Sequence, residues 1–127
     1  MKHFTVFLLL MFVLIMPAST DAVEIVDFQV MKTADLLDLC TASPEDDLYE
    51  QAINFCHGYL IGAFHYYAAS TIGPGGKQEI CFPVPKPTRN EAVGMFVDWA
   101  TENSQFHNEL PVETEFRFLQ ETWPCDK

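Results

Sequence analysis

The first 22 residues constrain this chain most, because they decide in which compartment the remainder folds. Lys2 precedes an apolar run over residues 4–16, which only Thr5 interrupts, and Pro17 then leads into small residues ending at Ala22. This order is typical of a secretory signal peptide. The run is shorter than the roughly 20 residues that cross the hydrocarbon core of a membrane. We therefore expect cleavage after Ala22 and export of residues 23–127.

Size and charge limit what the exported part can be. Removing 22 of the 127 residues leaves 105, enough for one domain but not for two. The chain has 18 acidic and 7 basic residues, and the leader removes one of each, Asp21 and Lys2, so the net charge stays at −11. Nucleic acids and anionic membranes bind Lys and Arg, so neither is an expected partner. A basic partner fits, but acidic residues also serve solubility alone.

Four cysteines, Cys40, Cys56, Cys81 and Cys125, follow the leader. An even number of cysteines in a small exported chain indicates disulfides, here two, with three pairings open. Structural zinc sites usually carry closely spaced cysteine pairs, and these cysteines are far apart. We expect neither a metal nor a cofactor.

The apolar spacing predicts an all-α domain that begins with a short extended arm or single strand over residues 23–30. A first helix is expected from a Thr33 cap to about residue 42, and a long second helix from the Ser43-Pro44 start to about residue 70. Gly58 and Gly62, one turn apart in the second helix, indicate that another backbone approaches closely there.

Glycines and prolines over residues 71–87 predict a long loop, which we expect Cys81 to tether. Thr88 and Glu91 form a capping-box pattern that predicts the start of a third helix. A fourth helix, stopping at Pro124, is expected from an apolar stripe at helical spacing: Val112, Phe116, Leu119 and Trp123.

The length of the proline-rich loop bears on the cysteine pairing. Cys56 lies about 21 Å from the end of the second helix, at a rise of about 1.5 Å per residue. The loop can span that distance at about 3.3 Å per residue, which allows a Cys56–Cys81 bond. Cys40 and Cys125 would then join the first helix to the end of the chain.

Four short motifs occur in a fixed order along the exported part: Leu36-Leu37 before Cys40, then Cys56-His57-Gly58-Tyr59, Cys81-Phe82-Pro83 and Trp123-Pro124-Cys125. In order and spacing the chain resembles the Rap/Tai family, the periplasmic immunity proteins of type VI secretion. It departs from the family pattern in the link over residues 86–91 and at Trp123, where phenylalanine is common. The resemblance implies an all-α, disulfide-bonded and often dimeric protein that blocks a cell-wall amidase by occupying its substrate groove.

An amidase that cleaves beside D-glutamate must accept an anionic peptide, so a carboxylate-rich projection can compete for the same hydrogen-bond donors. The turn between the third and fourth helices combines such charge with an aromatic side chain. We therefore expect the partner-binding residues to be Glu102, Phe106, His107, Asn108 and Glu109. Ordinary solvated turn residues are the competing interpretation.

No pattern indicates catalysis. Cys56 and His57 are adjacent on a helix, where side chains diverge by about 100°, and an oxidised cysteine is no nucleophile. His57 and His65 lie two turns apart, too far to share a metal ion. Two other classes remain as alternatives: a carrier of a small apolar ligand, suggested by the 13% aromatic residues, and an acid-stress periplasmic chaperone like HdeA.

Overall fold

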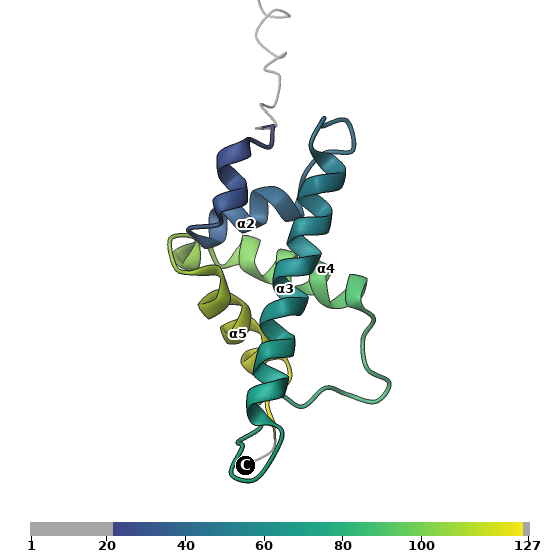
Figure 1. The fold of residues 1–127 in the computed structure, drawn as a ribbon, viewed down its shortest axis with the longest axis vertical. Coiled ribbons are helices and arrows are strands. Elements are labelled where there is room, and N and C mark those ends of the chain that lie inside the picture. The colour runs from purple at the N-terminus through teal and green to yellow at the C-terminus, as the bar shows by residue number, and fades with distance from the viewer. Residues whose placement is uncertain (1–21, 126–127) are drawn as a thin grey trace, which may run out of the picture.

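The described part of the chain forms four α-helices, which confirms the predicted all-α class (Figure 1). The structure, a computed structural model, describes residues 22–125. The helices are α2 (Thr33–Cys40), α3 (Tyr49–Thr71), α4 (Arg89–Glu102) and α5 (Pro111–Thr122), with short 3-10 helices η2 (Ile25–Gln29) and η3 (Ser104–Phe106). The expected signal peptide, apart from Ala22, lies outside the described residues. Within residues 22–125 no helix has the length and apolarity to cross a membrane.

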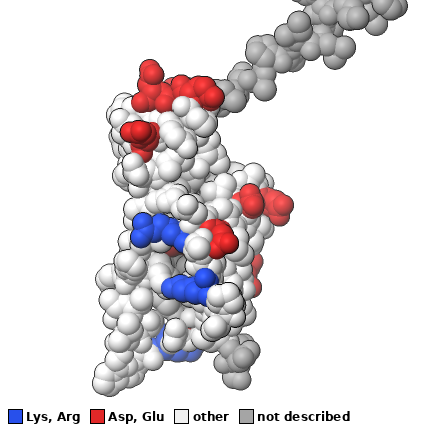
Figure 2. All heavy atoms as spheres, turned by 90° about the vertical axis from the view of Figure 1, so that its right-hand side faces the viewer, with Lys and Arg blue, Asp and Glu red and all other residues white. Residues whose placement is uncertain are grey.

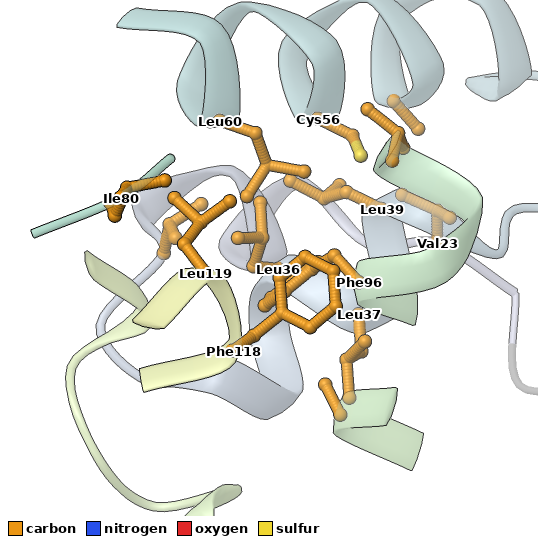
Figure 3. Close-up of a cluster of buried hydrophobic side chains, with 14 of the residues drawn as sticks. Val23, Leu36, Leu37, Leu39, Cys56, Leu60, Ile80, Phe96, Phe118 and Leu119 are labelled. Carbon is orange, nitrogen blue, oxygen red and sulfur yellow. The ribbon is translucent and has the colours of Figure 1, made fainter. Parts of the chain in front are cut away.

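The long helix α3 runs the length of the molecule, and the shorter helices gather beside it (Figure 1). Their apolar faces form one core in which Leu60 of α3 points toward Leu36 and Leu119 (Figure 3). Leu36 and Leu39 are completely buried, and Phe96 of α4 contacts Phe118 of α5 edge to face. Burying a side chain of this size contributes roughly 1.5 to 3 kcal/mol, so this core is the main source of stability.

The first described segment is helical and not extended, so the predicted arm over residues 23–30 is wrong. Glu24 and Asp27 form a capping box in which the Glu24 amide donates to the Asp27 carboxylate at 2.7 Å, and η2 follows directly. The Val23 amide donates to the Asp46 carboxylate at 2.8 Å. That contact joins the segment to the turn before α3.

Helix α3 begins at Tyr49, later than the Ser43-Pro44 pattern predicts. The Asp46 carboxylate accepts from Val23 and also from the Leu48 amide at 2.8 Å, which holds residues 43–48 in turns. A hydrogen bond from a distant part of the chain therefore stabilises turns where the local sequence favours the first turn of a helix.

Two further helix starts were predicted, with opposite outcomes. Thr33 is not a cap, since it lies inside α2 and its hydroxyl meets Thr114 in the core at 2.7 Å. The Thr88–Glu91 capping box is confirmed, because the Glu91 amide donates to the Thr88 hydroxyl and the Thr88 amide to the Glu91 carboxylate.

The face of α5 differs from the predicted stripe. Val112 is 36% exposed and Phe116 is only half-buried, whereas Leu119 and Trp123 are buried as expected. The buried face is made instead by Pro111, Thr114, Glu115, Phe118 and Leu119. Thr114 and Glu115 are polar, so a prediction based on the spacing of apolar residues assigned the buried face to Val112 and Phe116 instead.

The four cysteines form two disulfides, as predicted, but both expected pairings, Cys56–Cys81 and Cys40–Cys125, are wrong. The bonds are Cys40–Cys56 and Cys81–Cys125. Helix α2 ends at Cys40, a short turn reverses the chain, and Cys56 is buried two turns into α3. The Cα atoms of Cys40 and Cys56 are 5.2 Å apart. Loop length permits the pairing that we expected, but the packing of α2 on α3 decides against it.

Cys81 does tether the proline-rich loop, as predicted, but to the end of the chain. The Tyr67 hydroxyl accepts from the Glu79 and Ile80 amides at 2.7 and 3.1 Å, which holds this part of the loop near the end of α3. Phe82 then packs on Phe64 of α3 with ring centroids 5.3 Å apart. The Cys81 amide then donates to the Trp123 carbonyl at 2.8 Å.

The two glycines of α3 do not mark a close approach. A Cβ atom built on Gly58 or Gly62 would meet nothing within 4 Å, so both lie on an open face of the helix. In the following loop, by contrast, Gly73 and Gly75 adopt φ values of 125° and 83°, which side chains other than glycine rarely tolerate.

Candidate functional site

The predicted partner-binding residues all lie at the junction of α4 and α5, most of them in the turn over residues 103–110. This turn is fixed to α2 through its backbone. The Thr33 amide donates to the Glu109 carbonyl at 2.8 Å, and the Ala34 amide donates to the His107 carbonyl at 3.0 Å. The first amides of a helix have no partner within the helix, so the turn satisfies two donors that α2 leaves open. The turn is therefore held by the helix on which it rests.

The side chain of Phe106 contacts an aromatic ring and a guanidinium group. Its ring stacks on Trp99 with centroids 5.6 Å apart and planes inclined by 8°. The Arg117 guanidinium lies 4.4 Å from the Phe106 ring centroid and also forms a 3.2 Å ion pair with the Glu109 carboxylate. Stacking of this kind adds about 0.5 to 1.5 kcal/mol to the burial of the rings, which stiffens the turn.

His107 completes the turn by a contact with α4. Its Nε2 donates to the Ala100 carbonyl at 2.9 Å, at the end of the helix. Phe106, His107 and Glu109 thus have partners inside the molecule, whereas Glu102 and Asn108 are exposed. Of the five predicted residues, Glu102 at the end of α4 and Asn108 in the turn therefore present their side chains to solvent.

A cavity of about 180 Å³ opens between α3, α4, α5 and the proline-rich loop. Its walls are mostly apolar, with Leu60, Phe96, Phe118 and Leu119 among the buried residues that line it. Glu115 of α5 also lines the cavity and is only 3% exposed. The carboxylate oxygen Oε2 of Glu115 is buried without a hydrogen-bond partner among the described residues.

Burial raises the pKa of the Glu115 carboxyl from 4.5 to about 8. The charged form is disfavoured because no donor or cation replaces the water that burial removes. Burial also raises the pKa of Tyr59 on the facing helix α3, and the nearby Glu115 carboxyl adds to that increase. The Glu115 carboxyl is therefore predominantly neutral at pH 7.

The mouth of the cavity is basic. Lys86 and Arg89 line it and are exposed, and the Lys86 Nζ lies 4.4 Å from the ring centroid of Phe82 and 5.1 Å from that of Phe64. The ion pairs within residues 22–125 join Lys32 to Asp35, Lys77 to Glu79 and Arg117 to Glu109. Lys86 and Arg89 are thus the two basic residues of this region without a carboxylate partner.

Basic side chains gather on one part of the surface. In Figure 2, Lys and Arg side chains lie across the middle of the face that looks out beside the proline-rich loop, with an acidic side chain close beside them, and other acidic side chains gather at the end where α3 begins. In a chain with a net charge of −11, a local basic patch beside a cavity is unexpected.

Sequence reasoning missed this cavity and Glu115. The signal that could have found Glu115 is its position: residues 111, 115, 118 and 119 share one face at helical spacing, and Glu115 is the only charged residue among them. Within residues 22–125 no group of His, Cys, Asp and Glu side chains could hold a metal ion.

Comparison with known proteins gives a family match. The model of the Rap1a immunity proteins matches residues 32–125, from the residue before α2 to the last cysteine. No curated protein and no solved structure matches.

Proposed function

The chain belongs to the Rap1a immunity protein family, and on that basis we propose that it neutralises a peptidoglycan amidase by occupying the substrate groove of the enzyme. Members of the family are periplasmic, neutralise effectors of type VI secretion and are not enzymes. The amidase as target and the groove as binding site are the parts that we propose.

The observation that carries this proposal is the rigid turn between α4 and α5. The backbone contacts of Thr33 and Ala34 with the turn fix its conformation before any partner arrives. A preorganised loop loses little conformational entropy on binding, so more of its contact energy appears as affinity. Glu102 and Asn108 then contact the donors that would otherwise bind the anionic wall peptide.

We further propose that residues 1–22 are a signal peptide and that residues 23–127 act in the periplasm as a single domain. The two disulfides support export, since such bonds persist in oxidising compartments and are rare in the cytosol. A comparison of the periplasmic and cytosolic fractions by mass spectrometry tests this, and a periplasmic protein that begins at Val23 is the expected form.

A homodimer is the second assembly that we propose. Ile25 and Val26 of η2 are 73% and 56% exposed, and the Phe28–Phe55 ring contact brings η2 beside α3, where Phe55 is 36% exposed. Pairing two copies through these side chains would remove apolar surface from water. Light scattering of the mature protein should give twice the mass of one chain, and a single-chain mass at high concentration would contradict the dimer.

The amidase proposal is tested with a peptidoglycan amidase, sought first in the reading frames beside that of this chain. The Glu102→Lys, Asn108→Lys double variant should lose inhibition of wall-peptide cleavage by about 10-fold or more, as expected when charge-assisted hydrogen bonds are lost at an interface. Glu121→Lys, an exposed charge reversal elsewhere on α5, is the matched control and should inhibit like the wild type. Equal inhibition by all three proteins would remove the turn from the interface.

A further inference from the structure

The cavity beside α5 has a carboxyl group at its buried end and two basic groups at its mouth. Glu115 lies at the buried end with an unpartnered oxygen, and Lys86 and Arg89 lie at the exposed end without carboxylate partners. Apolar walls separate them. A buried polar atom without a partner costs roughly 1 to 3 kcal/mol, and such a group in a cavity commonly marks a binding site.

We propose that this cavity binds a small zwitterion, an ω-amino carboxylate whose ammonium group meets Glu115 and whose carboxylate meets Lys86 and Arg89. The aliphatic chain between the two groups lies against Leu60, Phe96 and the other apolar walls. This site goes beyond the inhibition of an amidase and does not depend on it.

The size of the cavity fits such a molecule. A cavity of about 150 Å³ in another protein holds benzene, which has six heavy atoms. The chain and nitrogen of 6-aminohexanoate also amount to six heavy atoms, and the carboxylate remains at the mouth. A cavity of about 180 Å³ is therefore sufficient.

The two ends exclude simpler ligands. A fatty acid would offer a carboxylate to Lys86 and Arg89 but leave the Glu115 carboxyl without a partner. An alkylamine would offer an ammonium group to Glu115 but no anion to Lys86 and Arg89. Rotation about the last torsion of Glu115, which is broad for this residue, presents either oxygen to the cavity. Two charge-assisted contacts together with burial of the chain favour the bifunctional molecule over both.

Binding is linked to a proton. At pH 7 the ammonium group meets a carboxyl that is predominantly protonated, so that proton leaves for the solvent as the ion pair forms. The other titratable and charged groups that face the cavity or Glu115 are Tyr59 and His65 from α3, Lys86 from the loop and Arg89 from α4. Burial raises the pKa of Tyr59 above its ordinary value, which favours the neutral hydroxyl, and His65 is exposed at the mouth.

The test is a calorimetric titration of the mature protein with 6-aminohexanoate, hexanoate and hexylamine at pH 7. The first compound should bind about 10-fold or more tightly than either of the others, and its observed enthalpy should vary with the ionisation enthalpy of the buffer. Amide shifts in NMR spectra should cluster at residues that line the cavity. No saturable binding of 6-aminohexanoate, or equal binding of hexanoate, would overturn the proposal.

Variants locate the two ends. Glu115→Gln keeps the shape of the side chain and should weaken 6-aminohexanoate binding about 10-fold or more, to the level of hexanoate. The Lys86→Gln, Arg89→Gln variant should weaken it to the level of hexylamine. Lys77→Gln, which removes an exposed lysine paired with Glu79, is the control and should bind normally. Wild-type affinity in both test variants, with folding verified by circular dichroism, would contradict the assignment.

Discussion

The turn between α4 and α5 and the cavity beside α5 lie on the same two helices, yet they are built in opposite ways. In the turn, the carbonyls of His107 and Glu109 accept from α2, and the ring of Phe106 is stacked on Trp99. In the cavity, the buried carboxyl of Glu115 has an oxygen without a partner. The turn is held by contacts within the molecule, whereas the cavity contains a buried carboxyl oxygen without a hydrogen bond.

The two regions suit different kinds of partner. A region whose internal contacts are satisfied keeps its shape and can enter a groove of another protein with little loss of conformational entropy. A region with an unsatisfied buried group gains most from a small molecule that supplies the missing group. The two regions also depend on different cross-links, because Cys40–Cys56 fixes α2 beneath the turn and Cys81–Cys125 fixes the loop beside the cavity.

The largest expected effect comes from the disulfides. Replacing Cys81 and Cys125 by alanine opens a link with a sequence separation of 44 and should cost about 4 kcal/mol, whereas replacing Cys40 and Cys56 opens one of 16 and should cost about 3 kcal/mol. Denaturant unfolding measures both values. The first variant should lose 6-aminohexanoate binding and the second should lose amidase inhibition. Loss of inhibition in the first variant and loss of ligand binding in the second would contradict the separate roles of the two disulfides.

Glu115→Gln should stabilise the protein by about 3 kcal/mol at pH 7. The folded-state pKa of Glu115 is raised from 4.5 to about 8, so the folded state holds its proton more tightly than the unfolded state does. The wild type therefore loses stability as the pH rises from 4.5 to 8, and the glutamine variant avoids that loss.

Unfolding by guanidinium at pH 4, 6 and 8 measures this dependence. The advantage of Glu115→Gln over the wild type should be smallest at pH 4 and largest at pH 8. Glu113→Gln, an exposed neighbour on α5, is the control and should show no such trend. A constant difference at all three values would mean that Glu115 has a partner in the folded protein.

Phe106→Ala should destabilise the domain by about 2 kcal/mol, because it removes the stack on Trp99 and the contact with Arg117. It should also weaken amidase inhibition, since the turn loses its fixed shape. Thermal unfolding and inhibition assays measure the two effects. Val84→Ala removes part of a side chain that is 99% exposed and should change neither. Full inhibition by Phe106→Ala would mean that the fixed shape of the turn is not needed for inhibition of the amidase.

The smallest effect is expected at the start of α4. Thr88→Ala removes the hydroxyl that accepts from the Glu91 amide and should cost about 1 kcal/mol. Because Thr88 lines the mouth of the cavity, ligand binding should weaken slightly while amidase inhibition stays unchanged. Thr101→Ala, an exposed substitution within α4, should be neutral in denaturant unfolding.

Local patterns predicted the fold well where the residues involved act on their own neighbours. The capping box of Thr88 and Glu91 gave the start of α4, and the glycines and prolines gave the loop before it. Prediction failed where a distant contact takes over. Asp46 accepts a hydrogen bond from the amide of Val23, and the helix that Ser43 and Pro44 favour begins only at Tyr49.

The candidate site shows the same limit. The spacing of the cysteines along the chain indicates which pairs can come within bonding distance. The packing of α2 on α3 then selects Cys40–Cys56. The turn over residues 103–110 was found from its charge and its aromatic residue, both of which are local. Glu115 was missed because its burial depends on three helices and a loop that meet only in the folded molecule.

Cross-saturation NMR on the complex tests whether the rigid turn is the surface that meets the amidase. The method identifies the amides of this protein that lie against its partner. Saturation should reach residues 102–109 and leave the cavity residues Val93 and Phe118 unaffected. Saturation confined to the cavity or to the acidic start of α3 would contradict the claim.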